Sequence, residues 1–362
     1  MKKEIKIEPN ICNVCQEPRL QYAFSAHDYI TDENFELWLC PDCQAMATMP
    51  RLNDEELQKY YQGVYYGRRK SFVDQFINNE RVWTIKKLYK TYLKNYSFGH
   101  SAARGEPRLR RERGEESHDT LSSDKPEILH FVQDDNMSIL DIGCGNGLFL
   151  NGLKKIGWKI AGTELAPESH VHPDISPFVC NKPVNECTFT GESFDIITMW
   201  HTLEHFINPS LYLRDANRIL KRSGVLIIEV PNFKSWQFLI TGKHWFPLEI
   251  PRHRTHFSPQ AIKIILEKTE FQIVRISYGN FFYDVFGFTQ SILNSLCRQK
   301  NILFNILNGK LSASINGVRS VFDVFITVVL TPPLSIIGII LFFIEIATKH
   351  GGTMRIYSKK TS

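Results

Sequence analysis

Ser138–Leu150 reads SILDIGCGNGLFL, an apolar run that ends in a glycine-rich turn and leads into a second apolar segment. Glycines let the backbone approach a ligand closely, and the N-terminus of a helix after such a turn favours a polar or anionic group. The stretch therefore predicts a buried strand, a ligand-binding turn and a helix, in that order.

The chain on the C-terminal side of this stretch alternates apolar runs with amphipathic segments. The expected strands are Met137–Ile142, Trp158–Thr163, Phe194–Met199, Val225–Pro231 and Phe271–Tyr278. The expected helices are Leu148–Gly157, Pro209–Leu220 and Ser258–Glu270. Such alternation predicts an α/β fold in which helices cover both faces of a parallel sheet.

The spacing of the turn and the acid before it indicate the ligand. Gly143, Gly145 and Gly147 stand as GxGxG, whereas the dinucleotide fingerprint is GxGxxG. Asp141 would repel a pyrophosphate but suits a cationic ligand such as S-adenosylmethionine, which carries an ammonium and a sulfonium. Glu164 closes the next strand and can accept hydrogen bonds from ribose hydroxyls. Because nicotinamide dinucleotides also contain this ribose, Glu164 alone does not discriminate.

Four motifs together resemble class I S-adenosylmethionine-dependent methyltransferases: DIGCGNG, GTE, FDIITMWHTLEHF and NRILKRSGVLIIEVPN. The likeness is strongest to the branch that includes the ubiquinone-biosynthesis O-methyltransferases, and it covers about residues 137–280. It implies a Rossmann-like, doubly wound sheet of seven strands. Some bacterial members also carry an N-terminal CxxC…CxxC module and a tyrosine-rich stretch like YYQGVYYG.

The resemblance also implies roles for individual residues. Asp141 and the three glycines would cradle the methionine end of the cofactor, and Glu164 would hold the ribose. Trp200 and His201 would lie along the cofactor near the transferred methyl group. The acid that many members use for the adenine amine is missing from PFVCNKPVN, so Asn181 is the candidate there.

Cysteine spacing predicts a second kind of site. Cys12 and Cys15 form one CxxC knuckle, and Cys40 and Cys43 form another. Two knuckles joined by a β-rich stretch are typical of a zinc ribbon with a closed, structural ion. The alternative is four unpaired structural cysteines. The other four are scattered, at Cys144, Cys180, Cys187 and Cys297. This usage favours a metal site in a reducing compartment over a disulfide framework.

Catalytic candidates come from the histidine-rich stretch TGKHWFPLEIPRHRTHFSP. His253 or His256 is the candidate general base, and His201 is a further catalytic candidate. The alternative for His256 is packing against the helix that begins at Ser258.

His201–His205 reads HTLEH and matches the inverted zinc-protease motif HxxEH. That motif requires a long helix, whereas this segment follows a strand. A metal ion on His201, Glu204 and His205 is the next alternative. The simplest interpretation is that Glu204 and His205 fix the loop through hydrogen bonds.

Domain organisation follows from composition. We expect a zinc ribbon over 1–50, a helical connector over 51–96, a disordered insert over 97–136, the methyltransferase core over 137–280, a hydrophobic helical segment over 281–350, and the last core strand and tail over 351–362.

Residues 321–347 are strongly apolar, but Pro332 and Pro333 interrupt the run. TMRIYSKK, at 353–360, is expected as the last strand of the sheet, which places both ends of the segment on one side of any bilayer. A helical hairpin in monotopic contact with a membrane satisfies this, and a buried dimer or lid element is the alternative.

Overall composition narrows the function. The 362 residues are 43% hydrophobic with a net charge of +5, well short of a nucleic-acid footprint. The start of the chain lacks the pattern of a signal peptide, so we expect a cytoplasmic protein, with a peripheral place on the inner face of the cytoplasmic membrane as the variant. We expect methylation, on oxygen, of a small-molecule, sugar or lipid-linked acceptor. The alternatives are an RNA methyltransferase, a non-catalytic cofactor-binding protein and, last, an NAD-dependent oxidoreductase.

Overall fold

The computed structural model describes residues 11–61, 72–90, 137–165, 170–309 and 318–361. Its centre is a seven-stranded sheet. The strands, in spatial order, are β10 (Phe271–Tyr278), β11 (Thr353–Lys360), β8 (Leu220–Pro231), β7 (Phe194–Trp200), β4 (Ser138–Ile142), β5 (Lys159–Thr163) and β6 (Val179–Cys180).

The order of the strands is that of a doubly wound sheet. β8, β7, β4, β5 and β6 run parallel, and β11 lies antiparallel between β8 and β10. The prediction that TMRIYSKK forms a strand of this sheet is confirmed, as is the Rossmann-like α/β class. Because the parallel strands end at one edge, the loops after β4, β5 and β7 meet there.

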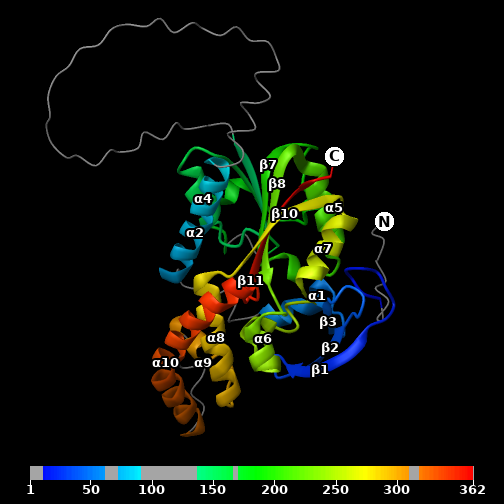
Figure 1. Cartoon of the computed structure of the whole chain (residues 1–362). Helices are drawn as coiled ribbons and strands as arrows, with labels where there is room; N and C mark the ends of the chain where they lie inside the picture. Colours follow the sequence, from blue (N-terminus) through cyan, green and yellow to red (C-terminus); the bar gives the residue numbers. More distant parts are fainter. Residues whose placement is uncertain (1–10, 62–71, 91–136, 166–169, 310–317, 362) are drawn as a thin grey trace, which may run out of the picture.

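Helices cover both faces of the sheet (Figure 1). On one side lie α2 (Phe72–Leu88) and α4 (Leu148–Lys154). On the other lie α5 (Pro209–Ile219) and α7 (Pro259–Lys268). At the start of α7 the Ser258 side chain accepts from Ala261 N, and a proline stands in the first turn.

The alternation of side chains along β7 feeds two cores. Ile196 points into the layer below α2 and α4, together with Phe149 and Ile85. Ile197 points to the opposite layer, below α5 and α7, together with Leu213. This period of two places the loop after β7 between the two layers at the carboxyl edge.

The N-terminal part forms a four-stranded antiparallel sheet. It consists of β1 (Gln21–His27), β2 (Asn34–Leu39), β3 (Met46–Met49) and β9 (Thr255–His256). The fourth strand comes from the histidine-rich loop of the larger unit, so the two parts share a sheet. β3 is followed by α1 (Asp54–Leu57), which Asn53 caps, and by the 3-10 turn η1 (Gln58–Tyr61).

Short helical elements join the remaining parts of the fold. They are η5 (Ser176–Phe178), η6 (Val184–Glu186), η7 (Leu203–His205), α6 (Trp236–Thr241), η8 (Gly242–His244) and η9 (Phe246–Leu248).

Two local predictions were wrong. The helix expected over Pro209–Leu220 ends at Ile219, and β8 begins at once at Leu220, well before the expected Val225. The structure also joins Cys180 and Cys187 in a disulfide, although the sequence favoured cysteines outside disulfides. The turn after β6 brings these two Cα atoms within 6.2 Å, a proximity that spacing alone does not reveal.

A helical hairpin stands out from the sheet between β10 and β11 (Figure 1). It comprises α8 (Phe281–Leu296), α9 (Ile302–Leu307) and α10 (Val318–Thr348). The expected interruption at Pro332 and Pro333 was wrong, because α10 continues through both. Packing of α10 along α8 maintains the helix where two N–H donors are missing. The expected insert over 97–136 and the segment 91–96 lie outside the described residues.

Candidate functional site

The glycine-rich turn takes the conformation that its sequence predicts. Gly143, Gly145 and Gly147 have φ values of 74°, 56° and 75°, which disfavour residues with a Cβ. A Cβ on Gly147 would lie 2.7 Å from Ile175 Cγ2, whereas one on Gly145 would meet nothing within 4 Å. The turn is thus packed from behind at Gly147 and open at Gly145, where a ligand can approach the backbone.

Asp141 lies below this turn and is 3% exposed. Thr198 Oγ1 donates to its Oδ1 at 2.6 Å. Burial raises the pKa of Asp141 to about 7, against which the Thr198 hydrogen bond and the nearby Arg81 act. A cationic ligand above this carboxyl would favour its ionised form, which is the charge match that the sequence suggested.

Glu164 directly follows β5 and makes hydrogen bonds both to the glycine-rich turn and to β6. Its carboxylate accepts from Gly145 N at 2.7 Å and from Leu165 N at 2.8 Å. The Glu164 amide donates to Cys180 O at 3.2 Å, so Asn181 follows directly at the same edge. The three places expected for the methionine end, the ribose and the adenine therefore lie on consecutive strand ends.

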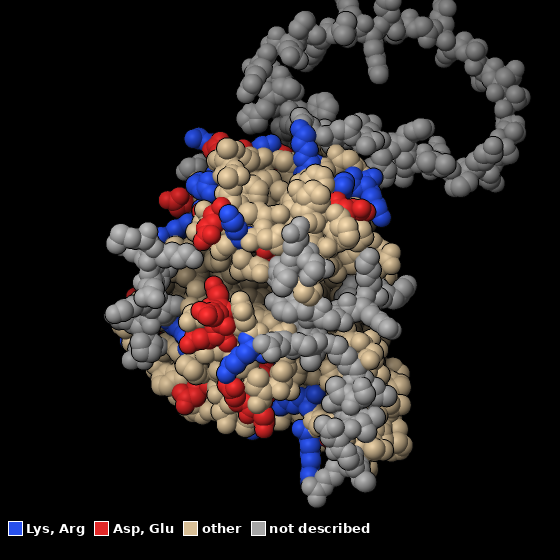
Figure 2. Space-filling view, turned by 180° about the vertical axis from the view of Figure 1, so that it is seen from behind, with Lys and Arg blue, Asp and Glu red and all other residues tan. Residues whose placement is uncertain are grey.

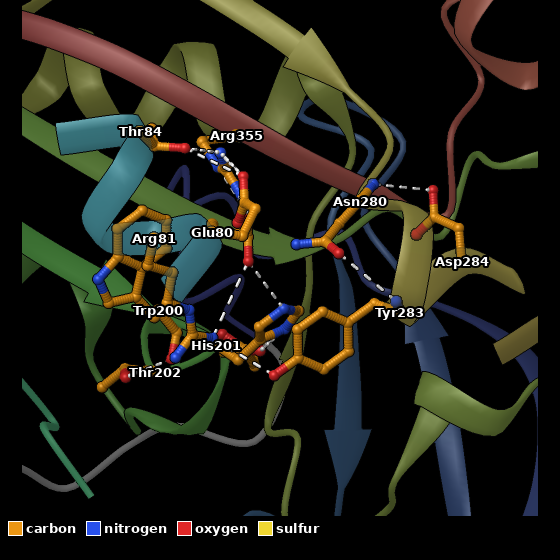
Figure 3. Close-up of polar contacts among 12 residues, drawn as sticks. Glu80, Arg81, Thr84, Trp200, His201, Thr202, Asn280, Tyr283, Asp284 and Arg355 are labelled. Carbon is orange, nitrogen blue, oxygen red and sulfur yellow. Dashed lines mark hydrogen bonds and ion pairs between the residues drawn. The ribbon is translucent and has the colours of Figure 1, made fainter. Parts of the chain in front are cut away.

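Trp200 is the last residue of β7, and His201 follows it at the same edge of the sheet (Figure 3). The guanidinium groups of Arg81 and Arg355 each lie 5.1 Å from the centroid of the Trp200 ring. Trp200 Nε1 is buried and has no hydrogen-bond partner among the described residues. The indole is fixed by its neighbours while its N–H is left for a ligand or water.

His201 sits between two buried carboxylates. Its Nδ1 lies 3.6 Å from Glu204 Oε1, and its Nε2 lies 3.3 Å from Glu229 Oε1. Burial lowers the pKa of His201, but these carboxylates outweigh it and raise the pKa to about 10. The imidazole is therefore a cation at neutral pH and does not suit the role of a general base.

Glu229 is the centre of a network that the sequence analysis missed (Figure 3). Arg355 bonds Glu229 Oε2 through Nε at 2.7 Å and Glu80 through Nη1 at 2.9 Å. Burial opposes ionisation, yet Arg355 and His201 hold the pKa of Glu229 well below its ordinary value. The sequence does show a charged residue, Glu229 or Arg355, within each of two expected strands. It does not show that the two residues pair, because this depends on which strands are neighbours in the sheet.

Glu204, His205 and His253 form a cluster next to His201, which we call the carboxylate corner. Glu204 is 1% exposed, and neither of its oxygens has a hydrogen-bond partner among the described residues. His253 Nε2 lies 3.9 Å from Glu204 Oε1 and 3.8 Å from Glu249 Oε2. Glu204, His205 and His253 could together hold a metal ion, because one ligand atom from each lies within 4.8 Å of the others. The HTLEH motif forms the 3-10 turn η7 here, not the long helix of a zinc protease.

The two candidate bases occupy different surroundings. His253 Nδ1 donates to Pro247 O at 2.8 Å, which leaves its Nε2 as an acceptor facing Glu204. His256 belongs to β9, where its Nε2 lies 3.2 Å from Thr48 Oγ1. Burial lowers the pKa of both histidines, to about 3 for His256. Of the two, only His253 faces the carboxylate corner.

The N-terminal part holds the histidine-rich loop in place. Arg252 Nη1 donates to Asp28 Oδ1 at 2.8 Å, and both side chains are fully buried. Thr48 Oγ1 donates to His253 O at 2.7 Å, and Arg254 pairs with Asp54 at 2.7 Å. These contacts come from segments about two hundred residues apart in the chain.

The four cysteines of the two knuckles meet in one buried cluster. Cys12 Sγ lies 3.5 Å from Cys43 Sγ, and Cys15 Sγ lies 3.4 Å from Cys40 Sγ. A tetrahedral zinc with Zn–S bonds of about 2.3 Å requires S–S separations of about 3.8 Å. Small movements of the thiols would therefore complete a closed S₄ site.

Comparison with known proteins agrees with this geometry. Residues 115–276 match a family model described as a methyltransferase domain. A ubiquinone biosynthesis O-methyltransferase from Bartonella tribocorum is 28% identical over 187 residues, which cover 48% of this chain and 72% of the relative. Its counterpart in Azorhizobium caulinodans is 30% identical over 125 residues, which cover 32% of this chain and 49% of the relative.

The chain therefore contains a methyltransferase domain of the class I, S-adenosylmethionine-dependent type. Among solved structures, a SAM-dependent methyltransferase from Archaeoglobus fulgidus is 22% identical, covers 62% of this chain and 86% of that chain, and has a TM-score of 0.36, which is too low to add to the conclusion. The methyltransferase motifs of the sequence lie on the strand ends where the fold places a cofactor.

Proposed function

We propose that the methyltransferase acts on a hydroxyl group of a small acceptor, a sugar or phenol that is carried on a lipid. The observation that supports oxygen as the target is the His253 corner. Its Nε2 is an acceptor held 3.8 Å and 3.9 Å from two carboxylates, and a hydroxyl must lose a proton during transfer while a sulfonium needs no acid.

His253 is our candidate for the base. Pro247 O fixes its tautomer through Nδ1, so Nε2 accepts the hydroxyl proton. Glu204 and Glu249, which both lie on the Nε2 side, would then stabilise the imidazolium. S-adenosylmethionine, when bound at the glycine-rich turn, supplies the methyl group. His201, already a cation between Glu204 and Glu229, serves to position this corner.

Replacing His253 with Ala should lower turnover roughly 100- to 10,000-fold, the usual contribution of a general base. The measurement is formation of S-adenosylhomocysteine with a panel of phenols, catechols and sugars, scored on the acceptor that the wild type uses best. Affinity for S-adenosylmethionine should stay unchanged, because His253 does not contact the glycine-rich turn.

The matched control is His350→Ala, since His350 is exposed and lies at the end of α10. Full turnover in the His253→Ala protein would remove the base from the proposal. Loss of turnover in His256→Ala alone would transfer the role to His256, the second candidate.

We also propose that the cysteine cluster holds a structural zinc ion. The support is the donor set: four buried thiols, two from each knuckle, with no open ligand position. The site lies against the loop that carries His253, so the ion would maintain the acceptor side of the enzyme.

The hairpin suggests where the acceptor is met. Ser320–Thr348 is long and apolar enough to cross a membrane, and only 11% of its most apolar stretch is buried. The exposed apolar side chains of α10 are Val321, Phe322, Phe325, Val328, Val329, Ile336, Ile337, Ile339, Ile340, Phe343, Ile344 and Ile346. In Figure 2 the lower right edge of the molecule, on the side of the hairpin, shows uncharged atoms where residues drawn in grey do not cover it.

We propose that this face of α10 enters one leaflet of a bilayer. A helix of 31 residues is about 46 Å long, enough to cross, but both hairpin ends return to the sheet at β10 and β11. The hairpin therefore binds from one side, and a monotopic place on the cytoplasmic membrane follows.

Placing Asp at Phe325 and at Ile340 should lower binding to phosphatidylethanolamine–phosphatidylglycerol vesicles about 100-fold, because each carboxylate would have to leave water. Vesicle flotation measures this. Trp83→Asp is the matched control, since Trp83 is 59% exposed but lies on α2. The alternative outcome is that the wild-type protein does not float with vesicles and is a dimer that the two Asp substitutions convert to a monomer. That result would assign the face to a second copy of the chain.

A further inference from the structure

A small, partly open pocket lies apart from the glycine-rich turn, where three segments of the chain meet. His27, at the end of β1, forms one wall, and Lys243 and His244 of η8 form another. Asn294 of α8 and Lys300, which follows that helix, form the third. The pocket is thus bounded by the zinc-ribbon part, the histidine-rich loop and the hairpin.

Positive charge gathers in this pocket. Burial and the neighbouring Lys243 lower the pKa of Lys300, and burial, Lys300 and Lys243 lower the pKa of His244. His244 Nδ1 is buried without a hydrogen-bond partner among the described residues. Three cationic or protonatable groups therefore repel one another across a small volume, which a bound anion would relieve.

Acidic groups near the pocket do not cancel this charge. Glu249 is the one acid among the lining residues, and its carboxylate lies 4.0 Å from Arg252 Nε and 3.8 Å from His253 Nε2. Asp28 and Asp32 attract Lys300, but Asp28 is already bonded to Arg252, and the Asp32 side chain is 96% exposed.

The position of the pocket indicates what kind of anion belongs there. Glu249 lines it and also faces His253, so it adjoins the corner where the acceptor hydroxyl would react. Asn294 and Lys300 belong to the hairpin whose α10 carries the exposed apolar face. In a lipid-carried acceptor, the group that would lie between His253 and the apolar face of α10 is the anionic link that joins the methylated group to the hydrocarbon chain.

We propose that this pocket binds the phosphate or diphosphate ester of the acceptor, with Lys243 and Lys300 as its cationic partners. Lysine is a point charge that suits phosphate oxygens from several directions. Asn294 Nδ2 donates to Asn301 Oδ1 at 3.0 Å, which holds that side of the pocket in shape. The inference rests on the proposed function, because it names the link that a lipid-carried acceptor requires.

The test is calorimetry of the full chain with three probes: farnesyl diphosphate in neutral detergent micelles, inorganic pyrophosphate, and farnesol. We expect farnesyl diphosphate to bind, pyrophosphate to bind more weakly, and farnesol to show no binding that depends on the lysines. K243Q/K300Q should weaken diphosphate binding roughly 10- to 100-fold, as expected for lost charged contacts. K263Q is the matched control, because Lys263 is an exposed lysine on α7.

The outcomes separate the sources of the phosphate. Pyrophosphate bound as tightly as farnesyl diphosphate would support the pocket but assign it to a soluble phosphate ester. Unchanged diphosphate affinity in K243Q/K300Q, or no binding of either diphosphate, would overturn the inference. Because Lys243 is exposed, K243Q alone gives a variant whose fold is not at risk.

The same experiments distinguish this inference from the proposed function. Wild-type protein that floats with vesicles and binds S-adenosylmethionine, but binds no diphosphate, would contradict the pocket alone. Protein that fails both flotation and diphosphate binding would contradict the lipid-carried acceptor as well.

Discussion

Asp141→Asn will weaken binding of S-adenosylmethionine roughly 10- to 100-fold, the range expected when a buried carboxylate loses its charge toward a cation. The substitution keeps the shape of the side chain, and Thr198 Oγ1 can still donate to the amide oxygen that replaces Oδ1. The loss therefore reports charge and not packing. Isothermal calorimetry at pH 8 measures it.

The affinity for S-adenosylmethionine should also depend on pH through the ionisation of Asp141. Burial raises its pKa to about 7 in the free protein, so the carboxyl is protonated below that pH and ionised above it. A cationic ligand binds the ionised form, and affinity should therefore fall by up to about tenfold for each pH unit below 7. Asp141→Asn should abolish this slope.

The control for both measurements is Asp32→Asn, because the Asp32 side chain is 96% exposed and lies in the N-terminal part. Equal affinity in the wild type and in Asp141→Asn, with the same pH profile, would show that the carboxyl does not face the ligand charge.

Cys40→Ser will have the second large effect, on the acceptor side of the enzyme. Loss of a structural zinc removes several kcal/mol from the part that contains it. That part supplies β3, which pairs with β9, and Asp28, which neutralises the buried Arg252. Breaking one partner of a buried pair costs about 3–5 kcal/mol, so the loop should lose its order together with the ribbon.

Hydrogen exchange checks this directly. Amides of residues 244–257 should lose protection in Cys40→Ser or after chelation, whereas β4 and β5 should keep theirs, and S-adenosylmethionine should still bind. Cys297→Ser is the matched control, since Cys297 is buried but lies outside the cluster. Unchanged protection of 244–257 in a protein that has lost its zinc would separate the loop from the ion.

The part of the site that depends on local sequence could be predicted. Glycine spacing, Asp141 and Glu164 lie at the ends of strands whose apolar runs are visible in the chain, and parallel strands bring such ends together. The caps at Asn53 and Ser258 are also local signals, because each side chain accepts from the backbone of the helix that directly follows it.

The rest depends on contacts between distant segments. Nothing in the spacing of TGKHWFPLEIPRHRTHFSP shows that its end becomes the fourth strand of the N-terminal antiparallel sheet. Likewise, Glu229 and Arg355 pair because β8 and β11 are neighbours, 126 residues apart in the chain. The prolines of α10 misled for a related reason, since packing along α8 outweighs the local cost.

Calorimetry of the chain with S-adenosylmethionine and with NAD tests whether the turn at 143–147 binds S-adenosylmethionine. We predict one binding site for S-adenosylmethionine and no heat from NAD. No binding of S-adenosylmethionine, or tight binding of NAD, would contradict this assignment of the turn.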